Sequence, residues 1–145
     1  MGPRRALSAA IAVLGWVATP AVACERADFE RVVEQAALAL RDLNLANKPA
    51  FQAKLGELKT KRGWSNDQFI ERAAPLVQDA TIADYDTRSA ALLEKLEAGG
   101  EKGTSARTPD CALLSELTAT LGTLLEVQKA KWAYMMNRVE AELAK

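Results

Sequence analysis

The last stretch of the chain, CALLSELTATLGTLLEVQKAKWAYMMNRVEAELAK (residues 111–145), decides the fold class. Its apolar residues recur at steps of four and three, the spacing that keeps side chains on one face of an α-helix. The inward positions are Leu113, Leu117, Leu121, Leu124, Gln128, Trp132, Met135, Val139 and Leu143. Thr108 as N-cap and Pro109 at the first helical position predict where this helix begins.

A helix that ran from this cap to the end of the chain would be about 54 Å long at 1.5 Å per residue. That exceeds the size of a compact domain of this length, so we expect either a projecting end or a break near Gly122. The residues before it are also rich in helix formers, and no strand-like alternation persists. The sequence therefore predicts an all-α single domain, a helical bundle of four to five helices with a long C-terminal helix.

Glycine and proline divide the preceding residues into predicted helices. Asn47 and Pro49 predict a break and a restart, and Gly63 predicts a left-handed cap at the end of the restarted helix. Pro75 predicts a kink or a break near residues 73–76. The pair Gly99–Gly100 predicts the end of the third helix, followed by a polar linker to Thr108 that lacks the spacing of a phosphate-binding loop.

The segment GWSNDQF (residues 63–69) has the pattern of a helix N-terminus. Ser65 and Gln68 have the S-x-x-Q spacing of a capping box, in which each side chain bonds the other residue's backbone N–H. Trp64 and Phe69 stand at the two positions of a hydrophobic staple. These four residues are therefore interpreted as a structural cap, and a binding platform on Trp64 is the alternative.

The N-terminus has the three parts of a cleavable secretory signal, predicted to span residues 1–23. Arg4 and Arg5 form the positive region, residues 6–17 form a short apolar run, and Ala21-Val22-Ala23 is a small-x-small cleavage pattern. The predicted helical domain is then 24–145, a periplasmic chain with Cys24 as its first residue. The apolar run is too short to cross a bilayer, and no second run approaches that length.

The two cysteines, Cys24 and Cys111, are predicted to form a disulfide, because exported thiols meet an oxidising compartment. Their Cα atoms should then lie about 4.4–6.8 Å apart. The alternative is lipidation: residues 21–24, AVAC, resemble a bacterial lipobox, although Ala21 stands where leucine is usual. In that case Cys24 would anchor the protein to a membrane, and Cys111 would keep a free thiol.

Composition makes several chemistries improbable. The chain has no histidine, the usual general base and a common zinc and haem ligand, so we expect no metal and no cofactor. Removal of the signal leaves 17 basic and 19 acidic residues, a balance without the positive field that attracts nucleic acid. An enzyme would have to work with arginine, lysine and carboxylate side chains, and no catalytic residue is predicted.

The best candidate for an interaction patch lies in residues 129–138, KAKWAYMMNR. Trp132 and Met135 fall on the inward stripe of the helix, whereas Tyr134 and Met136 fall beside it. Packing in the core or in a homodimer is one interpretation, and a patch for a partner or a small apolar ligand is the other. We therefore expect a non-enzymatic exported binding protein, with a small helical enzyme and a lipid-anchored envelope component as alternatives.

Overall fold

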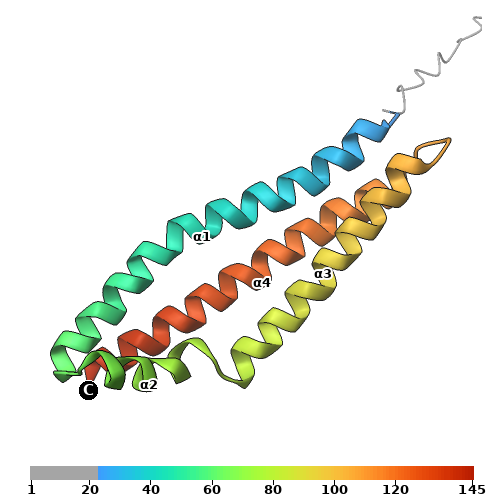
Figure 1. The fold of residues 1–145 in the computed structure, drawn as a ribbon. Helices are drawn as coiled ribbons and strands as arrows, with labels where there is room; N and C mark the ends of the chain where they lie inside the picture. The colour runs from blue at the N-terminus through green and yellow to red at the C-terminus, as the bar shows by residue number, and fades with distance from the viewer. Residues whose placement is uncertain (1–22) are drawn as a thin grey trace, which may run out of the picture.

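The computed structural model describes residues 23–145, so the predicted signal peptide lies outside the described residues apart from Ala23. Its elements are α1 (Arg26–Arg62), α2 (Asn66–Val77), α3 (Ala80–Ser105) and α4 (Cys111–Ala144). The three long helices lie along one another, and the short α2 crosses one end of them (Figure 1). The predictions of an all-α fold and of a long C-terminal helix are confirmed.

Helix α1 runs through Pro49, so the predicted break and restart at Asn47 and Pro49 are wrong. Asn47 does not cap a helix; its side chain instead donates to the Leu43 carbonyl over 2.7 Å. Pro49 is exposed, as is Leu45, whose carbonyl loses a helical partner and is left to water. Figure 1 shows α1 bending in its middle part, the ordinary accommodation of a proline within a helix.

The predicted left-handed cap at Gly63 and the predicted capping box of Ser65 and Gln68 are confirmed. Gly63 has φ 64° and ends α1 in the left-handed conformation. The Ser65 hydroxyl accepts from the Gln68 backbone N–H, and the Gln68 side chain accepts from the Ser65 backbone N–H over 3.0 Å, which completes the capping box. Trp64 packs against the core, and the Lys59 ammonium lies 5.6 Å from the centre of the Phe69 ring.

Helix α2 passes through Pro75 and ends at Val77, so the break falls just beyond the predicted residues 73–76. Asp79 then caps α3, because its carboxylate accepts from the Ile82 backbone N–H over 2.7 Å. The chain therefore turns sharply between two helices with only Gln78 and Asp79 between them.

The prediction that Gly99–Gly100 ends the third helix is wrong, since α3 continues to Ser105 and the loop spans only residues 106–110. A Cβ atom on Gly100 would lie 2.5 Å from a Val33 methyl, and one on Gly103 would lie 2.0 Å from the Phe29 ring. These glycines let α1 and α3 approach closely, so they serve packing between helices rather than helix termination.

Helix α4 is continuous through Gly122, so no break shortens it; α1 is of similar length and the bundle is elongated. Asp110, not Thr108, is the N-cap, and its carboxylate accepts from the Ala112 and Leu113 backbone N–H groups. Within residues 23–145 no helix is both long enough and apolar enough to cross a membrane.

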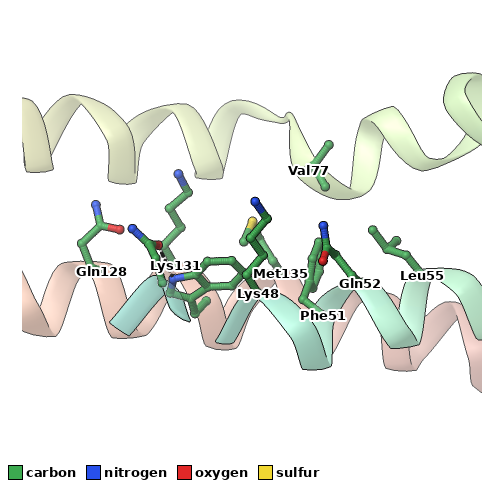
Figure 2. Close-up of a pocket in the computed structure, with 10 residues that line it drawn as sticks. Lys48, Phe51, Gln52, Leu55, Val77, Gln128, Lys131 and Met135 are labelled. Atoms are coloured by element: carbon green, nitrogen blue, oxygen red, sulfur yellow. Dashed lines mark hydrogen bonds between the residues drawn. The ribbon is translucent and has the colours of Figure 1, made fainter. Parts of the chain in front are cut away.

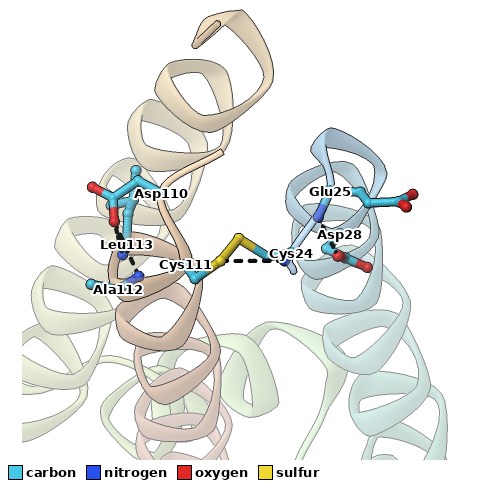
Figure 3. Close-up of a disulfide and its surroundings, with 7 residues drawn as sticks. All are labelled: Cys24, Glu25, Asp28, Asp110, Cys111, Ala112 and Leu113. Carbon is cyan, nitrogen blue, oxygen red and sulfur yellow. Dashed lines mark hydrogen bonds between the residues drawn. A yellow bond between two sulfur atoms is a disulfide. The ribbon is translucent and has the colours of Figure 1, made fainter. Parts of the chain in front are cut away.

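A disulfide joins Cys24 to Cys111, as predicted, with a Cα–Cα distance of 5.5 Å (Figure 3). It fixes the start of α1 beside the start of α4. The Asp28 carboxylate accepts from the Glu25 backbone N–H over 2.8 Å, and this bond, together with Arg31, lowers the pKa of Asp28. Arg26 donates to the Ala106 carbonyl, so the loop between α3 and α4 is also tied to this end of the bundle.

The apolar core consists of two separate clusters along the bundle. The cluster near the disulfide is built from Phe29, Val32, Ala36, Leu96, Leu117 and Leu124. The cluster near α2 is built from Phe51, Leu58, Leu76, Ile82, Met135 and Val139. The candidate site lies beside the junction between these two clusters.

Candidate functional site

Polar side chains occupy inward positions where the two apolar clusters meet. Ser89 of α3 is only 4% exposed, and its hydroxyl accepts from the Gln128 side-chain amide of α4 over 2.7 Å. Asn47 of α1 is also partly buried, and its side-chain amide donates to the Leu43 carbonyl of the same helix. These residues lie between the two apolar clusters, so polar side chains interrupt the apolar core here.

A pocket of about 350 Å³ opens beside this junction, between α1, α4 and the end of α2. The residues that line it are Asn44, Lys48, Phe51, Gln52, Leu55, Val77, Gln128, Lys131, Trp132 and Met135. In Figure 2, Phe51 and Leu55 rise from α1, Met135 rises from α4, and Val77 lies across from them on the opposite ribbon. Its volume is at the lower end of the range found for small-molecule sites.

Aromatic and aliphatic groups form the walls of this pocket. The rings of Phe51 and Trp132 meet edge to face, with centroids 5.9 Å apart and planes at 72°. The Trp132 indole N–H donates to the Asn44 side-chain oxygen over 3.2 Å, which fixes the orientation of the indole. Phe51 and Met135 are almost fully buried, so the wall is held in place by the core behind it.

Lysines are the only charged residues that line the pocket, and no acid lines it. The Lys131 ammonium pairs with Asp86 of α3, and the Lys131 side chain is 21% exposed. Lys48 has no ion-pair partner among residues 23–145. Figure 2 shows both side chains pointing toward the ribbon of α2 and α3. The pocket therefore combines an apolar body with a positively charged rim.

The four residues of the predicted interaction patch lie close together but do not form one surface. Trp132 and Met135 line the pocket, whereas Tyr134 and Met136 are half-buried against the cluster near α2. The Tyr134 hydroxyl donates to the Asp79 carboxylate over 2.8 Å, and its ring lies 5.6 Å from the Arg138 guanidinium. Tyr134 is thus part of a network of polar contacts that joins α4 to the α2–α3 turn.

Asp79 is the centre of that network. The Ile82 backbone N–H, the Tyr134 hydroxyl and the Arg138 guanidinium all favour its charged form, and they hold its pKa below the ordinary value despite some desolvation. Arg138 also donates to the Pro75 carbonyl, so one guanidinium binds the ends of two helices. The contribution of a carboxylate with a lowered pKa is present above the unfolded-state pKa and is lost as the pH falls through the folded-state pKa.

Asp79→Asn is therefore expected to lower the thermal unfolding temperature at pH 7, because the amide cannot form the ion pair with Arg138. The difference from the wild type should shrink as the pH falls below about 4, where the wild-type carboxylate becomes protonated. Thermal melts of both proteins, followed by circular dichroism between pH 7 and pH 3, measure this difference in unfolding temperature. Asp84→Asn, at an exposed position, is the control, and a difference that stays constant with pH would contradict this account.

Among the other hollows, two gather several charged side chains each. One, beside α2, brings together Arg62, Arg72, Arg138, Glu71 and Glu142. Arg138 is paired with Asp79, and Arg62 contacts the carbonyl and the carboxylate of Glu142. These two arginines therefore hold neighbouring helices together. The other is a groove of about 440 Å³ between α1 and α3. Its apolar floor is bordered by Glu30, Glu34, Glu97 and Glu101.

The sequence identified only part of the pocket. Trp132 and Met135 belonged to the predicted patch, and Gln128 was recognisable as the one polar residue on the inward stripe. Lys48 carried no local signal and Val77 was recognisable only as an inward apolar position, because a place in the pocket depends on how α1 and α2 pack. Lys131 could be drawn on a solvent-facing side of its helix, but it lies largely buried at the rim.

The described residues contain no group of three or more histidine, cysteine or acidic side chains arranged to hold a metal ion. In comparisons with protein-family models, curated proteins and solved structures, the chain finds no match. The function must therefore be inferred from the chemistry of the pocket.

Proposed function

We propose that this protein is an exported, periplasmic binding protein that holds a small apolar ligand in the pocket between α1 and α4. The observation that carries the proposal is the preformed pocket of about 350 Å³ with Phe51, Trp132 and Met135 in its wall. Small-molecule sites are typically concave and mostly apolar, with a few polar groups that fix orientation. At about 30 Å³ per small group, the volume suits a ligand of about a dozen heavy atoms.

Export is the other part of the proposal, and it rests on the predicted signal at residues 1–23 and on the compatible disulfide. A lipid on Cys24 is excluded in any molecule that carries the bridge, because both would use the same sulfur atom. The intact mass of the mature chain, before and after reduction and alkylation, tests this point. A mass equal to residues 24–145 with two thiols appearing on reduction supports it, and an added diacylglycerol would contradict it.

Trp132 provides a direct test of ligand binding. The predicted mature chain has two tryptophans, so Trp64→Phe leaves Trp132 as the sole reporter in the wall of the pocket. Titration with 1-octanol is expected to change its fluorescence saturably, with a Kd of about 1 mM or tighter, the strength that a few buried methylene groups can supply. Isothermal calorimetry on the unmodified chain gives an independent measure.

A pocket-filling variant and its matched control complete this test. Val77→Phe, at the edge of the pocket, should weaken octanol binding about tenfold, because the added ring occupies the ligand's space. Ile70→Phe, on the exposed face of the same helix, should leave binding unchanged. Absence of saturable binding, or equal weakening by both variants in folded protein, would overturn the proposed pocket.

A further inference from the structure

We infer that the ligand of this pocket carries a single anionic group, such as a carboxylate, at the end of its apolar body. The inference rests on the proposed function and adds the ligand's charge and its orientation. Its basis is the polar lining: Lys48 and Lys131 contribute positive charge, and none of the lining residues is acidic. The remaining polar groups are the side-chain amides of Asn44, Gln52 and Gln128.

Existing hydrogen bonds decide which of these groups can receive a ligand. The Asn44 oxygen is already bonded to the Trp132 indole, which leaves the Asn44 amide nitrogen, a donor, free for a ligand. One N–H of the Gln128 amide is bonded to Ser89, so its second N–H and its oxygen remain for a ligand. When the unpaired Lys48 ammonium is included, the rim of the pocket has more free hydrogen-bond donors than free acceptors. An anion satisfies such a set better than a neutral or cationic group.

The second lysine indicates how the site would accommodate that anion. Lys131 is held by Asp86, whose side chain is 55% exposed on the solvent side of α3. A ligand carboxylate near Lys131 would share the ammonium with Asp86, and the two negative charges would repel each other. Lys48 therefore makes the main contact with the anion, and Asp86 limits the affinity.

Three probes of equal chain length separate the proposed charge from the proposed pocket: octanoate, 1-octanol and octylammonium. In the Trp64→Phe background, octanoate is expected to bind about three- to fivefold more tightly than octanol, the range for a partly exposed ion pair. This preference should decrease with added salt. Octylammonium should bind more weakly than both. If octanol binds as tightly as octanoate, or octylammonium binds best, the anion inference fails while the pocket stands; if none binds, the proposed function fails.

Charge-removing variants test which lysine contacts the anionic group of the ligand. Lys48→Met keeps an apolar stem of similar length, so it should remove the preference for octanoate over octanol. Lys102 is exposed on α3 and does not line the pocket. Lys102→Met is therefore the matched control and should preserve the preference for octanoate. Asp86→Asn should tighten octanoate binding about twofold without affecting octanol, because it releases the Lys131 ammonium. An unchanged preference in Lys48→Met, or weaker octanoate binding in Asp86→Asn, would overturn the assigned contacts.

Discussion

Replacing Cys24 and Cys111 together by serine is expected to lower the free energy of unfolding by about 4–5 kcal/mol, because the bridge closes a loop of nearly ninety residues in the unfolded chain. For a domain of this size the thermal midpoint should fall by about 12–20 °C. Urea denaturation of the oxidised wild type and of the double variant measures the change. Serine at both positions avoids the stray thiol that a single replacement would leave.

Reduction of the wild type supplies the control for this experiment, since it opens the same bridge without changing the sequence. The reduced wild type and the double variant should have similar stabilities. A loss below about 1 kcal/mol in both would mean that the unfolded chain is already compact around this end, contrary to the entropic account.

Gly103→Ala is expected to destabilise the protein by about 1–3 kcal/mol, although alanine is the better helix former. The new methyl group would lie 2.0 Å from the ring of Phe29, which is fully buried in the core and has no free space to move into. The approach of α1 to α3 would have to widen, and the cluster near the disulfide would lose contacts. Urea denaturation again measures the effect.

Gly122→Ala is the matched control, because Gly122 is also helical and nothing beyond its own helical backbone and chain neighbours lies within 4 Å of the added Cβ. There the substitution should stabilise the protein by about 0.5–1 kcal/mol, the ordinary gain of alanine over glycine in a helix. The two substitutions are thus expected to have opposite signs. Stabilisation by both would show that α1 and α3 are less tightly packed than the structure indicates.

Local chemistry explains which parts of the fold could be predicted from the sequence. Ser65 and Gln68 satisfy each other across a single turn, and Gly63 takes a conformation that suits glycine, so neither depends on distant residues. The Cys24–Cys111 pair was predictable because no other cysteine competes for either partner. The length of α4 was equally predictable, because its inward face is apolar at every position except Gln128.

The incorrect predictions concern residues whose role depends on other helices. Pro49 normally signals a helix boundary, but apolar packing on both sides, at Ala36 and Phe51, keeps α1 continuous across it. Gly100 looks like a helix terminator in the sequence and Gly103 like part of a linker, yet their missing side chains are what allows α1 to approach α3. The pocket was missed for the same reason, because three separate segments supply its lining.

The position of the bridge also has a consequence for the order of events during synthesis. Cys24 leaves the ribosome 87 residues before Cys111, so α1, α2 and α3 have all been made before its partner exists. The bond therefore cannot form while only the first three helices have been made, so it cannot stabilise a partly made chain. Any modification that competes for the Cys24 sulfur has to act before this bond forms.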